Sequence, residues 1–162
     1  MSDVESRPDP SADPLRGTSG PHPFHLAIRV GNLADTEAFY AGLLGAGIGR
    51  RSDRWIDFDL GGHQVTAHLD ESLDAPGEGE NPVDGDQVPV PHFGVVLPFD
   101  TWRTLADRLT AVDVDFLIAP RVRFEGQPGE QGTLFVRDPS GNALEFKGFR
   151  DGTQLFDDSG AY

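Results

Sequence analysis

The feature that most constrains the fold is an order of predicted elements that occurs twice along the chain. Periodicity and turn residues in the first half predict a strand, a helix capped by Asn32 and three further strands, at 24–30, 33–44, 48–51, 55–60 and 64–69. The second half repeats this order, with a helix capped by Asp100 and strands at 91–97, 132–136 and 142–149. A further strand, at 116–118 and 122–124, is expected to be broken near Pro120. A chain that repeats one supersecondary unit commonly pairs the copies.

The two halves can be laid on each other residue by residue. Aligning His25 with His92 brings the two opening strands into phase. Aligning Gly62 with Gly141 superposes the two final hairpins and puts Thr66 in the position of Glu145. Because identity between the halves is low, the repeat rests on pattern and on the placement of turn residues.

An acidic segment separates the halves. Residues 70–86 contain seven Asp or Glu and no Lys or Arg, which is half of the net charge of -14, together with several Gly and Pro. Like charge and turn residues predict a solvated connector that stays out of the core. We therefore expect a disordered acidic tail at 1–21, one domain at 22–150 and a tail at 151–162. Within the domain, module one spans about 23–70, the linker 71–88 and module two about 89–150.

Composition excludes several classes of function. The chain has no Cys, so a transition metal must be bound by His and carboxylate. The strongly negative charge disfavours nucleic acid and anionic membranes as partners. No apolar run reaches the roughly 20 residues of a membrane span, and the N-terminus lacks the apolar region of a signal peptide. We expect a cytoplasmic protein that acts on a small molecule.

Alternation along the strands places the polar candidates on one face of each sheet. The other face of each strand is apolar and suits packing under a helix. If the polar faces curve into a cup, they gather four side chains: His25, His68, His92 and Glu145. Two imidazoles and one carboxylate form the facial triad of non-haem Fe(II) sites. Spacing alone leaves the alternative open that these are structural histidines.

The alignment of the halves favours three protein ligands. Thr66 occupies the position equivalent to Glu145 and is a poor ligand, so His68 is expected either behind the metal ligands or beside the substrate. Lys147, the only Lys in the chain, lies on the face of Glu145 and could contact an anionic substrate. Arg29 shares the face of His25. We expect Lys147, Thr66 and Arg29 to bind substrate.

A group of arginines stands out in this acidic chain, at positions 50, 51, 54, 121 and 123. They could pair at the surface with the acidic segment, or they could form a fork for a substrate carboxylate. The sequence leaves both alternatives open.

Several motifs resemble the vicinal oxygen chelate superfamily, the group of glyoxalases, bleomycin-resistance proteins and extradiol dioxygenases. They are Phe24-His25-Leu26-Ala27, the Phe39-Tyr40 helix, Pro91-His92-Phe93-Gly94 and the turn and strand from Asp138 to Phe146. The resemblance covers roughly 23–150. Three further segments, at 55–59, 62–64 and 81–94, are similar to a small single-domain branch described as predicted extradiol dioxygenases.

This resemblance implies an α+β fold in which two βαβββ modules pair into a U-shaped, partly open mixed sheet with helices on its outer face. It implies a divalent metal bound by His25, His92 and Glu145, with Thr66 as a departure at the fourth-strand position, where glyoxalase-I-like members carry Glu. It also implies a catalytic His, for which His68 is available. Relatives are often homodimers.

The function expected from the resemblance is that of an Fe(II)-dependent extradiol-type dioxygenase acting on a small aromatic diol. Mn(II), Zn(II) and Ni(II) suit the same ligands. Phe135 stands where some relatives carry Tyr, a departure from the ring-cleaving pattern. The alternatives are a metal-dependent lyase or isomerase, and a binding protein that sequesters a small molecule.

Overall fold

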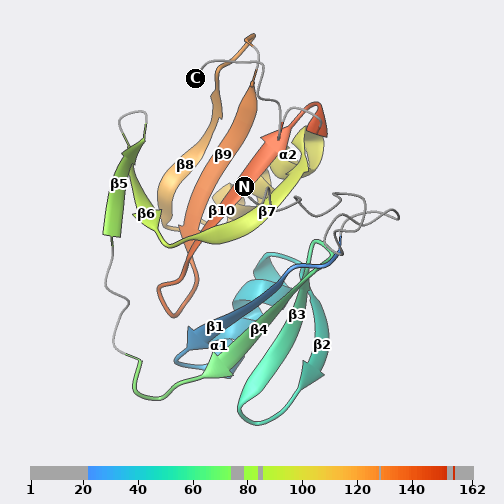
Figure 1. Ribbon diagram of the computed structural model, residues 1–162, viewed down its shortest axis with the longest axis vertical. Coiled ribbons are helices and arrows are strands. Elements are labelled where there is room, and N and C mark those ends of the chain that lie inside the picture. The colour runs from blue at the N-terminus through green and yellow to red at the C-terminus, as the bar shows by residue number, and fades with distance from the viewer. Residues whose placement is uncertain (1–21, 74–78, 84–85, 128, 153–154, 156–162) are drawn as a thin grey trace, which may run out of the picture.

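A computed structural model describes residues 22–73, 79–83, 86–127, 129–152 and 155, and these form two modules with the same topology (Figure 1). The first module consists of β1 (His25–Val30), α1 (Leu33–Glu37), the π-helical stretch η2 (Ala38–Leu43), β2 (Gly47–Arg51), β3 (Trp55–Leu60) and β4 (His63–Leu69). The second consists of β7 (Phe93–Pro98), α2 (Phe99–Ala111), β8 (Phe116–Arg123), β9 (Gln131–Arg137) and β10 (Ala143–Phe149). The predicted tail at 1–21 and most of that at 151–162 lie outside the described residues.

Strand order and register confirm the internal repeat. The sheets have the orders β1-β4-β3-β2 and β7-β10-β9-β8, and in each the first and last strands of the module run parallel. Ala27 pairs with Thr66 in the first sheet, and Gly94 pairs with Glu145 in the second. Because Thr66 and Glu145 are equivalent, Ala27 is equivalent to Gly94. His25 and His92, each two residues earlier, therefore occupy equivalent positions, as the alignment predicts.

Local sequence explains where the helices begin. The Asn32 side chain accepts hydrogen bonds from the backbone N–H groups of Ala34 and Asp35, which confirms the predicted cap of α1. The predicted cap of the second helix is wrong by two residues. α2 begins at Phe99 directly after Pro98, and Asp100 lies in its first turn, where a negative charge complements the helix dipole.

Two connections differ from the predictions. β8 runs from Phe116 through Pro120 to Arg123 as one strand, and the expected break is only a pair of register shifts against β9. The acidic linker contains a hairpin of β5 (Gly79–Val83) and β6 (Asp86–Val90). It is also not excluded from packing, because Val88 is buried against Ile118 and Phe135 on the second module. The acidic charge of the segment therefore does not prevent the burial of the Val88 side chain.

The two modules share one core. Buried residues from both sheets and both helical segments form a single cluster that includes Val30, Tyr40, Trp102 and Phe146. The strand residues of this cluster lie on the apolar faces of the sheets, which the helices cover from behind in the view of Figure 1. Each sheet packs its apolar face against the helical segments of its own module, and the polar faces of the strands point away from the core. Within the described part of the chain, no helix is long and apolar enough to cross a bilayer.

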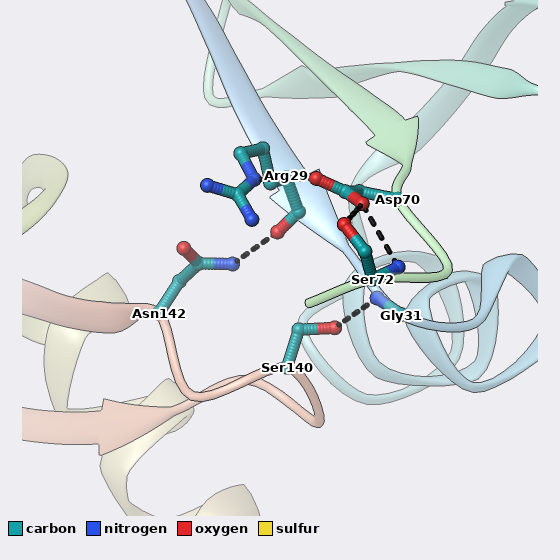
Figure 2. A network of polar contacts seen from close by, with 6 residues as sticks. All are labelled: Arg29, Gly31, Asp70, Ser72, Ser140 and Asn142. Atoms are coloured by element: carbon teal, nitrogen blue, oxygen red, sulfur yellow. Dashed lines mark hydrogen bonds and ion pairs between the residues drawn. The ribbon is translucent and has the colours of Figure 1, made fainter. Parts of the chain in front are cut away.

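The turn between β9 and β10 fastens the second module to the first (Figure 2). The Ser140 hydroxyl accepts a hydrogen bond from the backbone N–H of Gly31 (3.0 Å), and the Asn142 amide donates to the carbonyl of Arg29 (3.1 Å). Beneath them, the Tyr40 hydroxyl donates to the buried carboxylate of Asp138 (3.1 Å). This motif therefore sets the position of one module relative to the other.

Candidate metal centre

His92 and Glu145 meet on the polar face of the second module. His92 lies just before β7, and Glu145 lies on the neighbouring β10. The Nε2 atom of His92 is 3.2 Å from the Oε2 atom of Glu145. Both side chains are largely shielded, with exposed fractions of 28% and 11%. The strand register brings together two residues that are 53 positions apart in the sequence.

The imidazole of His92 is held in one orientation. Its Nδ1 atom lies 2.7 Å from the carbonyl oxygen of Pro89, and its ring meets the edge of Phe135 at a centroid distance of 5.1 Å. A carbonyl oxygen only accepts hydrogen bonds, so Nδ1 carries the proton. In the neutral ring, Nε2 then has a lone pair and faces the carboxylate. The carbonyl comes from the end of β6, so the hairpin that the sequence did not predict also orients this ligand.

Glu145 is oriented by two neighbours on the same face. The Thr133 hydroxyl, on β9, donates to Oε1 (3.0 Å). The ammonium group of Lys147 lies 3.6 Å from Oε2. Lys147 thus occupies the face predicted for it, beside Glu145, while its role in substrate binding remains a prediction.

These contacts suit a divalent cation. Two hydrogen-bond acceptors, the Nε2 lone pair of His92 and the Oε2 atom of Glu145, converge at 3.2 Å, and the Lys147 ammonium lies 3.6 Å from the same Oε2 atom. A cation or an added proton satisfies this arrangement. Imidazole and carboxylate are the donor types that first-row divalent metals accept, and a ligating His usually donates its other N–H to a carbonyl or carboxylate. The residues present therefore fit a metal centre.

His25 lies on the other sheet. It is exposed on β1, and its Nδ1 atom is 2.9 Å from the Oε1 atom of Gln64 on β4. No three His, Asp or Glu side chains among the described residues form a group that could hold a metal ion. One chain thus joins His92 with Glu145 but does not add His25 or His68 to them. The reason is that His25 lies on the sheet of the first module, whereas His92 and Glu145 belong to the second module.

A hydrogen-bonded network that the sequence analysis did not include lies around Thr66, at the fourth-strand position equivalent to Glu145. Thr66 is buried, and its hydroxyl donates to the Oδ1 atom of Asp57 (2.6 Å). Arg50 donates from Nε to Oδ2 of Asp57 (3.0 Å). Burial acts to raise the pKa of Asp57, but hydrogen bonds from Thr66, Arg50 and Gln64 outweigh it, so this pKa is lowered. Asp57 alternates with buried Ile56 and Phe58, which was the available signal for its place on the polar face.

The remaining predicted residues lie around the first module. His68 is exposed on β4, opposite Trp55 in the register. Arg29 forms an ion pair with Asp70 (2.8 Å), and Asp70 in turn accepts hydrogen bonds from the backbone N–H and hydroxyl of Ser72 (Figure 2). Arg29 therefore has an acidic partner at the module junction, and its role in substrate binding stays a prediction.

Three of the arginines that stand out in the sequence form ion pairs within the first module. These pairs are Arg50 with Asp57, Arg51 with Glu37 and Arg54 with Glu71. Arg54 pairs with Glu71 of the acidic segment, as the first interpretation predicts, whereas the partners of Arg50 and Arg51 lie outside that segment. The fork for a substrate carboxylate stays a prediction. Arg50 also borders an open hollow of about 330 Å³ that Asp57, Gln64 and His63 help to line.

Comparison with known proteins identifies the family. A family model for the Glyoxalase/Bleomycin resistance protein/Dioxygenase superfamily matches residues 22–146. The chain therefore belongs to this superfamily, which is the vicinal oxygen chelate group expected from the sequence motifs. No curated protein matches the chain significantly.

Solved structures agree with this assignment. A glyoxalase/bleomycin resistance protein/dioxygenase from Alicyclobacillus acidocaldarius is 30% identical, with a TM-score of 0.66 and coverage of 83% of this chain and 96% of the other. A glyoxalase/dioxygenase from Nostoc punctiforme is 15% identical, with a TM-score of 0.63 and coverage of 91% and 99%. A fosfomycin resistance protein from Listeria monocytogenes is 16% identical, with a TM-score of 0.58 and coverage of 80% and 93%. The last two show the fold alone.

Proposed function

We propose that the protein is a divalent-metal-dependent enzyme, and specifically an Fe(II)-dependent extradiol-type dioxygenase acting on a small aromatic diol. The observation that carries the proposal is the convergence of His92 Nε2 and Glu145 Oε2 while His92 Nδ1 is engaged by a carbonyl. Completed by His25, this donor set is two imidazoles and one carboxylate, which is typical of non-haem Fe(II) oxygenases.

A second copy of the chain is the proposed source of the third ligand. His25 stands in the first module where His92 stands in the second, and its Nδ1 is likewise engaged, by Gln64. Its strand face is exposed in one chain. In a two-fold homodimer, the polar face of one copy's first module would cover the polar face of the other copy's second module. Each dimer would then contain two complete sites.

The surrounding side chains would prepare such a site for an aromatic diol. When bound, the metal would supply a positive charge that favours the deprotonated diol and positions for diol and O2. Phe135, with Val88 and Ile118 packed against it, forms an apolar wall beside His92 that excludes water. Lys147 would stabilise negative charge on the bound substrate. From the facing module, Thr66 and Arg29 would contact the substrate, and His68 would accept and return its proton.

The first module disfavours the competing lyase or isomerase function. At the fourth-strand position Thr66 offers only a hydroxyl, and that hydroxyl donates to Asp57. Asp57 is itself engaged by Arg50. The first module therefore offers no carboxylate at this position as a fourth metal ligand. The three-ligand set of the dioxygenase proposal remains.

Anaerobic loading with Fe(II), followed by a panel of catechols and air, tests the proposal. We expect about one Fe(II) per chain, O2 uptake and a yellow ring-cleavage product. Glu145→Gln should lose both metal and activity, whereas Glu130→Gln, which alters a carboxylate paired with Arg150, should keep them. Metal binding without O2 uptake would contradict the dioxygenase and favour a lyase or isomerase. Absence of metal binding would contradict the whole proposal and favour a sequestering protein.

A further inference from the structure

The hydroxyl of Thr133 is a buried polar group beside the candidate metal centre. Thr133 lies on β9 with an exposed fraction of 1%, and its hydroxyl oxygen is 3.0 Å from the Oε1 atom of Glu145. In the register of β9 and β10, Thr133 lies opposite Lys147 and Glu145 lies opposite Phe135, so the contact crosses the strand pair diagonally. Because an ionised carboxylate only accepts hydrogen bonds, the hydroxyl is the donor.

The two carboxylate oxygens of Glu145 face different surroundings. Oε1 accepts from Thr133, whereas Oε2 lies 3.2 Å from the Nε2 atom of His92 and 3.6 Å from the ammonium group of Lys147. Since Nε2 carries the lone pair of His92, only Oε2 faces the point where the proposed ligands converge. Turning both oxygens toward His92 would take the acceptor away from a buried hydroxyl, which is unfavourable.

The internal repeat indicates that the fold does not require a hydroxyl at this strand position. The residue of the first module equivalent to Thr133 is Trp55, because each lies two positions before the residue that pairs with Thr66 or Glu145. An indole therefore stands beside Thr66, and a hydroxyl stands beside Glu145. The hydroxyl occurs in the module that provides the carboxylate ligand, which favours a role at the site.

We infer that Thr133 is a positioning residue that restricts Glu145 to one metal-binding oxygen, Oε2. The inference rests on the proposed function, because it requires a divalent cation bound by His92 and Glu145. A carboxylate can bind a cation through one oxygen or through both. Thr133 does not touch the cation and acts through Glu145.

Binding through one oxygen preserves the open positions that the proposed reaction uses. In a six-coordinate site, three ligands of one atom each leave three positions, enough for the two oxygens of a diol and for O2. A carboxylate bound through both oxygens would occupy one of these positions. Thr133 thus determines how many positions remain for substrates.

Infrared difference spectra of the full chain, recorded before and after addition of Zn²⁺, measure the binding mode. The two stretching frequencies of a carboxylate lie further apart when one oxygen binds a cation than when both do. Zn²⁺ has no redox chemistry, so the readout does not depend on turnover. We expect the one-oxygen pattern for the wild type, and its absence from Glu145→Gln assigns the bands.

Three substitutions of Thr133 separate the hydroxyl from the shape of the side chain. Thr133→Ser keeps the hydroxyl and should keep the one-oxygen pattern. Thr133→Val keeps the shape but removes the donor, so it should give the two-oxygen pattern. Thr133→Ala removes the donor with a smaller side chain and should behave like Thr133→Val.

Thr36→Val is the matched control. Thr36 is also buried, and its hydroxyl donates to the backbone carbonyl of Asn32 (2.6 Å) in the first module. This variant loses the same chemical group and should keep the wild-type spectrum. A one-oxygen pattern in both Thr133→Val and Thr133→Ala would overturn the inference and leave the metal-dependent function standing. A wild type without any carboxylate band that responds to Zn²⁺ would contradict the proposed function and the inference with it.

Water-proton relaxation by bound Mn²⁺ gives a second readout, because water fills the open positions when no substrate is present. Thr133→Val should hold about one water fewer on the cation than the wild type does. Thr133→Ser and Thr36→Val should hold as many as the wild type. Equal water counts in Thr133→Val and the wild type would contradict the inference.

Discussion

At the scale of single residues, His25 and His92 show how the same chemical requirement is met in two ways. Both donate from Nδ1, but His92 donates to the carbonyl of Pro89 and His25 to the side chain of Gln64. The His25 contact depends on a side chain and is therefore open to substitution. The backbone solution depends only on the hairpin that precedes β7. The Nε2 atom of His92 faces the Oε2 atom of Glu145 at 3.2 Å.

Gly94 allows β7 and β10 to pair closely at the candidate metal centre. A Cβ atom at this position would lie 1.6 Å from the carbonyl oxygen of Glu145. That oxygen belongs to the backbone and cannot rotate away. We predict that Gly94→Ala forces the strands apart and lowers the free energy of unfolding by about 3 kcal/mol or more. Chemical denaturation measures the loss. Metal affinity should fall as well, because Glu145 moves with its strand.

The control for this prediction is Gly42→Ala. A Cβ at position 42 would meet nothing within 4 Å. Its stability should therefore stay within about 1 kcal/mol of wild type. A Gly94→Ala protein as stable as the Gly42→Ala protein would show that the close approach of the two strands is unimportant.

At the scale of elements, the turn from Asp138 to Asn142 has a structural role that its sequence did not reveal. As a motif it predicts a turn and the strand that carries Glu145, and both are confirmed. Its side chains also reach across to the first module, to the backbone of Gly31 and Arg29. A turn motif specifies its own backbone through local hydrogen bonds. Contacts more than 100 positions away depend on how the modules pack and cannot be read locally.

Tyr40→Phe tests this connection. Burial, followed by the charge of Asp138 and the hydrogen bond to it, raises the pKa of Tyr40 far above its ordinary value, so the phenol stays neutral and remains a donor. Removing the hydroxyl leaves the buried carboxylate with one donor fewer. We predict a loss of about 1–3 kcal/mol in the free energy of unfolding, measured with urea.

Ser140→Ala provides the comparison, because it removes an exposed hydrogen bond of the same turn. Its cost should be no more than about 1 kcal/mol, since water can replace the lost acceptor. If the two substitutions cost the same, burial of the Tyr40–Asp138 contact would not matter.

Elements were predictable to the extent that local patterns specify them. The alternation in β1 and the cap at Asn32 are local signals, and both predictions are confirmed. The hairpin of β5 and β6 was missed because charge and turn residues dominate its sequence. Val88 packs against side chains about 30 and 47 positions further along the chain, and the neighbouring Pro89 is also buried.

At the scale of the whole molecule, the shared core decides which faces remain available. Each sheet packs its apolar face against its own helix, so the polar face of β1 and that of β7 and β10 are left without a helix over them in one chain. In the proposed homodimer, each site combines His25 of one copy with His92 and Glu145 of the other. A site shared between two copies predicts that two inactive variants can restore a complete site in a mixed dimer, whereas a site formed within one chain does not.

Complementation between inactive variants tests the shared site. His25→Ala and Glu145→Ala should each abolish metal-dependent activity. When the two variants are mixed, dissociated and allowed to reassemble, random pairing should give about half mixed dimers. Each mixed dimer has one complete site of its two, so about a quarter of all sites should be restored. Recovered activity and bound metal measure the restoration, and sedimentation confirms the dimer. No recovery from a reassembled dimer would mean that all ligands come from one chain.

The sequence by itself determined the repeat, the equivalence of His25 with His92 and of Thr66 with Glu145, and the polar face on which each candidate lies. These follow from strand alternation and turn residues, which act over a few positions. Only the tertiary structure decided that His92 and Glu145 come together, that Asp57 lies buried beside Thr66, and that His25 stays apart. Those outcomes depend on strand pairing and on packing between residues that are far apart in the sequence, which local patterns do not specify.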